Sequence, residues 1–168
     1  MTRDRASLIA TVSGVVILSA YLLLGSGGTD GPGGSPMQEL LTVEPWHCDV
    51  LDPEDSEIVA RSVGTFHAGG TLDGHTRVED RDTGALLLEF SYRGRWQFDD
   101  PWLTEAINDY RYTHVDHAAF SADELAAIEA EFAEPAVSRV HALSAGQLVY
   151  GAERSLYQCH RRPGGVNA

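Results

Sequence analysis

The chain has 168 residues, a net charge of −13, and 12 basic residues, all of them arginine. This balance argues against a nucleic-acid partner, because phosphate binding needs a basic face, and against broad adhesion to anionic lipid. About 130 residues remain after the N-terminal region, the size of one domain with a single core. We therefore predict one folded domain at 37–168.

The N-terminal region predicts a membrane anchor. Arg3 and Arg5 precede an uncharged run at 6–24, whose 19 residues would span roughly 28 Å as a helix, close to the bilayer's hydrocarbon thickness. The positive-inside rule then puts residues 1–5 in the cytoplasm and everything after Gly25 outside it, beyond a single pass through the membrane. A cleaved signal peptide is the alternative, although its apolar core is usually about 7–15 residues. Residues 25–36 are predicted to form a flexible linker.

Cys48 and Cys159 are the two cysteines of the chain. An even pair in an exported domain predicts a disulfide, here between the start and the end of the domain. Two buried thiols are the alternative. Closing a loop of about 110 residues would add on the order of 4–5 kcal/mol to the free energy of unfolding, if the gain comes from chain entropy.

The first part of the domain predicts a short helix and then strands. The helix is expected at 37–41, ahead of an extended piece near Trp46. Residues 62–67 and 71–79 are predicted strands separated by a glycine-rich turn. In the second of these strands, one face carries Leu72, Gly74, Thr76 and Val78.

The clearest alternation in the chain lies at 86–98. One face carries Leu86, Leu88, Phe90, Tyr92, Trp96 and Phe98. This period of two predicts a long, half-buried strand, bent at Gly94. Residues 102–115 are expected to give one or two further strands.

Residues 120–132 carry the signals of a helix. Ser121 and Glu124 have the spacing of a capping box, and Leu125, Ile128 and Phe132 form an apolar stripe. Three short strands are predicted to follow, at 137–143, 147–151 and 155–160.

This element order predicts a mainly β domain with minor α content. Neighbouring strands joined by tight turns form an antiparallel meander. Seven or eight such strands, with one helix across an opening, favour a small barrel that is closed or nearly closed.

Two groups of residues are candidates for a site. His114-Val115-Asp116-His117 contains possible metal ligands, but strand alternation would make them diverge, so we expect a polar loop there and neither a metal nor a catalytic site. The second candidate is the aromatic face, with Leu86, Leu88, Phe90, Tyr92 and Trp96. Its residues form either an ordinary barrel core or the wall of an apolar ligand cavity, and we expect no cofactor.

The whole layout resembles the ToxS family of single-pass inner-membrane proteins, which accompany ToxR-type transmembrane transcription regulators. The resemblance covers most of the chain at low identity. It rests on the N-terminal anchor, on the amphipathic segment ending near Trp46, and on Gly94-Arg95-Trp96 in a strand. Its most specific part runs from Phe120-Ser121-Ala122-Asp123-Glu124-Leu125 through Ile128 and Phe132 to Ser138-Arg139-Val140.

The resemblance implies a non-enzymatic, periplasmic, lipocalin-like β-barrel. Such a barrel forms a heterodimer with the periplasmic domain of a ToxR-type regulator, protects the regulator from proteolysis and promotes its activity. In some members the paired domains enclose an apolar chamber that senses bile salts. The resemblance carries over no catalytic or ligand-contact residue. A free-standing anchored binder of an apolar small molecule is the alternative.

Two features depart from the family's pattern. They are the cysteine pair and the acidic, lysine-free composition. The composition suggests a non-enteric host, which puts bile in doubt as the natural ligand.

Overall fold

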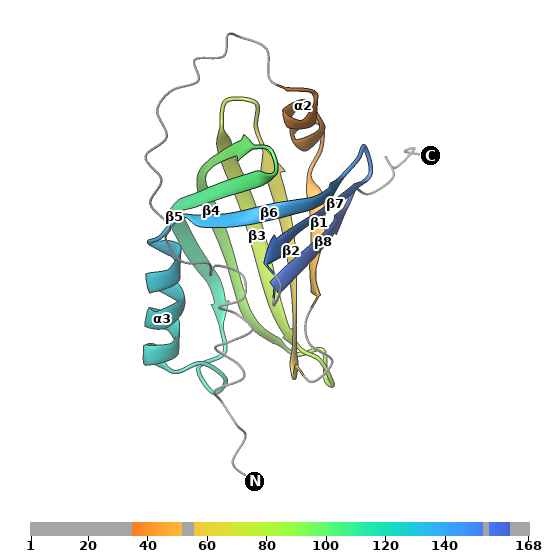
Figure 1. Cartoon of the computed structure of the whole chain (residues 1–168). Helices are drawn as coiled ribbons and strands as arrows, with labels where there is room; N and C mark the ends of the chain where they lie inside the picture. Colours follow the sequence, from red (N-terminus) through yellow and green to blue (C-terminus); the bar gives the residue numbers. More distant parts are fainter. Residues whose placement is uncertain (1–34, 52–55, 153–154, 162–168) are drawn as a thin grey trace, which may run out of the picture.

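The protein is described by a computed structural model at residues 35–51, 56–152 and 155–161. The predicted anchor at 6–24 lies outside these residues, as does most of the predicted linker at 25–36. The described part is mainly β, with eight strands in a closed antiparallel barrel and two helices (Figure 1). The predicted fold class of the domain is thus confirmed, and the barrel closes.

The strands follow one another around the barrel in chain order, and the first pairs with the last. They are β1 (Trp46–Leu51), β2 (Ile58–Phe66), β3 (Thr71–Asp80), β4 (Leu86–Asp99), β5 (Trp102–Val115), β6 (Ala136–Leu143), β7 (Gln147–Ala152) and β8 (Ser155–His160). This up-and-down arrangement is the lipocalin-like architecture. Since residues 102–115 form one strand, the number of strands is eight.

The alternation predicted for β3 is present in the structure. Leu72, Thr76 and Val78 are buried, whereas Asp73 and Arg77 are exposed. The burial pattern therefore assigns the even-numbered residues of β3 to the barrel interior.

The alternation of β5 is interrupted where its register with β4 shifts. Gly94 lies opposite Ile107, but Arg93 lies opposite Asp109, so Asn108 is an extra residue in β5. An extra residue reverses the alternation that follows it. Ile107 and Tyr110 therefore both lie on the interior face, although a strict period of two would separate them.

Helix α2 (Pro36–Thr42) lies at one end of the barrel. It begins just before the predicted domain boundary, and Ser35 and Gln38 form its capping box. The side-chain amide of Gln38 donates to the carbonyl of Phe98 at 3.3 Å. The indole of Trp46 donates to the carbonyl of Leu41 at 3.0 Å, so the helix is tied to both β1 and β4.

Helix α3 (Ala122–Phe132) lies beside the second half of β5 (Figure 1). Its predicted capping box is confirmed, because the Ser121 side chain accepts from the Glu124 backbone and the Glu124 carboxylate accepts from the Ser121 backbone at 2.7 Å. Ile128 and Phe132 are buried, as the predicted stripe requires. Phe132 contacts Tyr110 of β5, with 5.3 Å between ring centroids.

The barrel interior contains two hydrophobic clusters. The first, on the side of α2, contains Leu41, Trp46, Phe66, Leu72, Phe98, Leu103, Val140, Leu148, Tyr150 and Tyr157 among others. The second, on the side of α3, contains Ile58, Ala60, Val78, Leu87, Leu88, Phe90, Phe120, Ile128 and Phe132. Tyr92 packs against both clusters. The candidate site lies where they meet.

Candidate functional site

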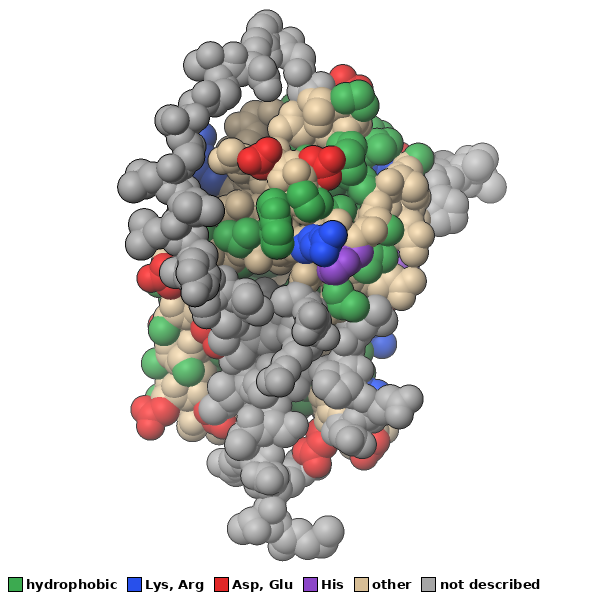
Figure 2. All heavy atoms as spheres, in the orientation of Figure 1, with side chains coloured by type: hydrophobic (Ala, Val, Ile, Leu, Met, Phe, Trp, Pro, Cys, Tyr) green, Lys and Arg blue, Asp and Glu red, His purple; other side chains and the backbone are tan. Residues whose placement is uncertain are grey.

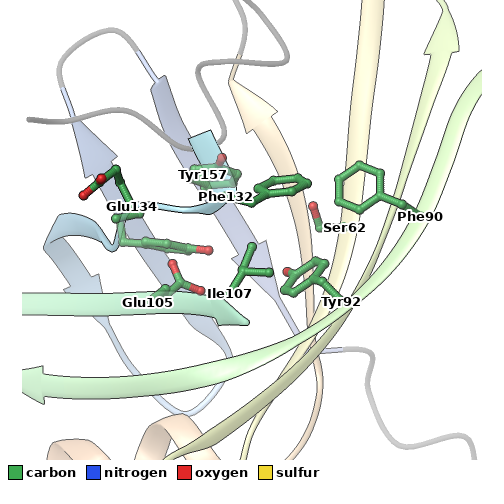
Figure 3. A pocket seen from close by; sticks show the side chains of 10 residues that line it. Ser62, Phe90, Tyr92, Glu105, Ile107, Phe132, Glu134 and Tyr157 are labelled. Carbon is green, nitrogen blue, oxygen red and sulfur yellow. The ribbon is translucent and has the colours of Figure 1, made fainter. Parts of the chain in front are cut away.

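A small cavity lies inside the barrel between the two hydrophobic clusters (Figure 3). Its lining consists of Ser62, Phe90, Tyr92, Glu105, Ile107, Phe132, Glu134, Ala136, Tyr150 and Tyr157. Its volume is about 40 Å³. A buried water needs roughly 10–15 Å³ of such space, whereas pockets for drug-sized ligands measure about 300–1,000 Å³. The cavity therefore has room for a few waters and not for a molecule of bile-salt size.

The predicted aromatic face is only partly gathered at this cavity. Phe90 and Tyr92 line it. Leu88 is fully buried in the cluster beside α3. Trp96 packs edge-on against Phe66 in the other cluster, and its indole donates to the carbonyl of His67 at 2.9 Å.

Leu86 does not share the face of Leu88, contrary to the predicted alternation. Val78 lies opposite Leu88, but Glu79 lies opposite Leu86, so Leu87 is an extra residue in β4. The bulge places Leu86 across from Glu79, which binds arginines on the outer face, and leaves Leu87 buried in the core. Residues 86–88 are all leucine, so an extra residue among them does not change the pattern of polar and apolar residues. Alternation alone therefore could not reveal the bulge.

Eight of the ten residues that line the cavity were not predicted as site residues, and Glu105 is the most informative of them. It lies on β5 between two inward residues, Leu103 and Ile107, and burial raises its pKa to about 7. The sequence did contain one sign that Glu105 faces inward, because aliphatic residues lie two positions before it and two positions after it. The irregular period of β5 hid that signal, because residues 102–115 could not be assigned a face.

Three tyrosines surround this acid. Burial raises the pKa of Tyr92, Tyr150 and Tyr157, and the nearby charge of Glu105 raises each further. The rings of Tyr150 and Tyr157 stack with their centroids 4.9 Å apart. At neutral pH these phenols are uncharged, so they offer the cavity hydroxyl groups and aromatic faces.

Gly74 determines where the Tyr92 ring lies. The two residues are opposite each other on β3 and β4, and a Cβ atom on Gly74 would overlap the tyrosine ring. The ring thus occupies space that any larger residue at position 74 would take. This contact holds one wall of the cavity in place.

The outer face of β1 to β4 is covered by alternating charges. Arg61 on β2 lies 3.7 Å from Asp49 on β1 and 2.5 Å from Glu79 on β3. Arg77 on β3 lies 3.4 Å from Glu89 on β4. Such exposed pairs add little stability, but they make this side of the barrel polar.

Apolar side chains are exposed where β5 and β6 pair. Trp102 is 49% exposed and Val137 is 42% exposed. Trp102 pairs with Arg139, and Thr104 pairs with Val137, so both apolar side chains lie on adjacent strands. Figure 2 shows hydrophobic side chains gathered along β6 and the neighbouring part of β5, beside one basic and one histidine side chain.

Along most of its length, one edge of β5 has no strand partner among the residues that the structure describes. β6 pairs with β5 only from Trp102 to Glu105. From Ala106 to Val115 β5 pairs with β4 alone within the described part of the chain, and α3 lies beside this stretch. We call the exposed Trp102 and Val137, together with the edge at 106–115 and α3, the β5 side.

The His114–His117 segment ends β5 and leads to α3. The His114 ring lies 3.1 Å from the carbonyl of Leu86, and the Asp116 carboxylate accepts from the Ala118 backbone at 2.9 Å. Within the residues that the structure describes, no group of three or more His, Cys, Asp and Glu side chains is placed to hold a metal ion.

Cys48 and Cys159 form a disulfide, with an S–S distance of 2.07 Å. The predicted pairing is therefore present, and it joins β1 to β8 at the seam of the barrel. No free cysteine remains.

The eight-stranded up-and-down barrel defines a lipocalin-like domain. No family model matches the chain, and no curated protein matches it. Among the described residues, no helix has both the length and the apolar character needed to cross a membrane.

Proposed function

We propose that the protein is a membrane-anchored, periplasmic co-regulator that binds and stabilises a ToxR-type transcription regulator. The proposed role is non-enzymatic and rests on the likeness of the chain to the ToxS family. The observation that carries it is the edge of β5 from Ala106 to Val115, which pairs with no strand other than β4 in the described part of the chain, next to two exposed apolar side chains. Strand edges recruit partner chains through backbone hydrogen bonds.

The partner contacts the β5 side. The outer face of β1 to β4 is covered by charge pairs, which favour contact with water. Exposed Trp102 supplies the kind of aromatic anchor that dominates binding energy at protein interfaces. Val137 lies beside it and extends the apolar contact.

The size of the interior cavity argues against an apolar small molecule bound inside the barrel. A volume of about 40 Å³ is several-fold below the roughly 300–1,000 Å³ of such sites. Phe132 and Tyr92 already occupy the interior that a ligand would need. A sensing chamber of bile-salt size would therefore require the partner domain to supply most of its walls.

Co-purification tests this proposal. The full chain is expressed with the ToxR-type regulator encoded by the neighbouring gene, and the regulator recovered from solubilised membranes is quantified. Trp102→Ala should weaken the association by about 2 kcal/mol, roughly 30-fold, because it removes the aromatic anchor. Val43→Ala is the matched control, since Val43 is 65% exposed and lies just after α2.

The proposal fails if the regulator does not co-purify with the wild-type chain and its half-life is unchanged when this protein is deleted. Equal losses from Trp102→Ala and Val43→Ala would place the interface elsewhere on the barrel.

A further inference from the structure

Glu105 carries a carboxyl group that has no counter-charge among the described residues. No hydrogen bond or ion pair joins it to another residue at 35–51, 56–152 or 155–161, and none of the residues lining its cavity is basic. The Glu105 side chain is half-buried. A carboxylate withdrawn from water with no counter-charge either takes up a proton or binds a cation.

Aromatic rings surround the carboxyl group. Tyr92, Tyr150 and Tyr157 line the cavity from β4, β7 and β8, and Phe90 and Phe132 complete its wall. In Figure 3 Tyr92, Glu105 and Ile107 face one space together with Phe132, whereas the Glu134 carboxylate points away from it. Aromatic faces attract cations, and cages of such rings recognise organic ammonium groups.

The volume of the cavity limits what can enter. A space of about 40 Å³ holds roughly three waters, or a ligand of about two to four non-hydrogen atoms. A calcium ion takes about six to eight oxygen ligands, and magnesium demands octahedral geometry. One carboxyl group among aromatic rings instead suits an alkylammonium group, whose methyl or methylene part contacts the rings.

A second acid also belongs to the cavity lining. It is Glu134, in the segment between α3 and β6, and it is exposed. The lining thus contains one exposed acid and one half-buried acid. With a net charge of −13, the whole molecule also attracts cations.

We propose that the cavity is a binding site for a small alkylammonium ion, paired with the Glu105 carboxylate and enclosed by Tyr92, Tyr150 and Tyr157. A free amine of this size, or the end of a lysine side chain from a partner, presents the same chemistry. The chain itself contains no lysine that could fill the site. The site does not depend on the proposed co-regulator role.

Calorimetric titration of the purified full chain with methylammonium chloride tests the site. The ionic strength is held constant with sodium chloride, and the pH is about 8. Saturable binding is expected, and Glu105→Gln should weaken it at least tenfold because the carboxylate is lost. Glu134→Gln should change it by less than about threefold, since that carboxylate is exposed to water.

Two further binding measurements need only the wild-type protein. With the pKa of Glu105 at about 7, protons compete with the amine, so the affinity should be about tenfold lower at pH 6 than at pH 8. The three tyrosines that face the cavity stay uncharged over this range, because burial raises their pKa. The exposed Glu134 is controlled by the Glu134→Gln variant. Tetramethylammonium, which is too large for the cavity, should not bind.

The source of the amine is distinguished by comparing methylammonium with N-acetyl-lysine amide. Tighter binding of the lysine derivative points to a partner side chain, and tighter binding of methylammonium points to a free amine. The site is refuted if neither compound binds above the sodium chloride background at pH 8. Equal binding to wild type and to Glu105→Gln would also refute it.

Discussion

Cys48 and Cys159 lie directly opposite each other on the first and last strands of the barrel, with their Cα atoms 3.9 Å apart. The disulfide between them therefore closes the barrel covalently at the one seam that joins the two ends of the domain. Their separation along the chain is 111 residues. A cross-link over so long a loop greatly restricts the unfolded chain.

Replacing both cysteines by serine should lower the free energy of unfolding by up to about 4–5 kcal/mol. Urea denaturation of the wild-type and Cys48→Ser/Cys159→Ser proteins measures the difference, and reduction of the wild type provides a second route. Peptide mapping without reductant should recover the two cysteines in one linked fragment. A loss below about 1 kcal/mol would contradict the role assigned to the bond at the barrel seam.

Glu105 should make stability depend on pH. Burial raises its folded-state pKa from an ordinary 4.5 to about 7. The folded protein then binds the proton more tightly than the unfolded chain, so the contribution of this group is fully present below about pH 4.5 and is lost as the pH rises through 7. The slope is at most about 1.4 kcal/mol per pH unit.

Urea denaturation between pH 5 and about pH 8 checks this dependence, with Glu105→Gln as the control that keeps the shape and removes the titration. The difference between the two proteins should grow with pH and level off above 7. If the two proteins keep parallel stability profiles, the Glu105 side chain does not titrate inside the barrel.

Gly74→Ala should destabilise the barrel by about 1–3 kcal/mol, because its methyl group would overlap the Tyr92 ring. Gly64 provides a matched control, since it lies directly opposite Gly74 on β2 and no atom lies within 4 Å of the Cβ it would gain. Thermal or urea unfolding of both variants measures the contrast. Similar losses of stability at the two positions would show that replacing any glycine in these strands by alanine is destabilising, and that overlap with the tyrosine ring is not the cause.

Tyr112 and Tyr110 should respond oppositely to loss of the hydroxyl group. The Tyr112 hydroxyl is buried and has no hydrogen-bond partner among the described residues, so Tyr112→Phe should be neutral or stabilising by about 1 kcal/mol. The pKa of Tyr110 is raised by burial, by the charge of Glu129 and by a hydrogen bond to that residue. Tyr110→Phe should therefore cost about 0.5–1.5 kcal/mol.

Urea denaturation of the two variants measures both changes. A larger loss for Tyr112→Phe than for Tyr110→Phe would mean that the Tyr112 hydroxyl has a partner.

Much of the fold could be predicted because short stretches of sequence specify their own helices, turns and strands, and these assignments are consistent with one another. The Ser121–Glu124 capping box, the turns and the alternation of β3 each fix an element from its own sequence. Barrel closure, by contrast, depends on β1 meeting β8 far along the chain. The cysteine pair was the only residue-level sign of that contact.

The site was harder to predict because bulges change which face a residue occupies. The extra residues Leu87 and Asn108 each reverse the alternation that follows them. As a result, Leu86 lies on the outer face and not on the predicted inner one, and the sequence alone could not assign Glu105 to the interior. The cavity volume also depends on how Phe132 and Tyr92 fill the barrel, which no period in the sequence encodes.

Site-specific photo-crosslinking in intact cells tests the co-regulator account most directly. A photoreactive residue is placed at Arg111, an exposed position on the half of β5 that pairs only with β4 in the described part of the chain, and in a control at Gln158, an exposed position on β8. The account predicts a crosslink to the ToxR-type regulator from position 111 and none from position 158. No crosslink from position 111, or equal crosslinking from both positions, would contradict it.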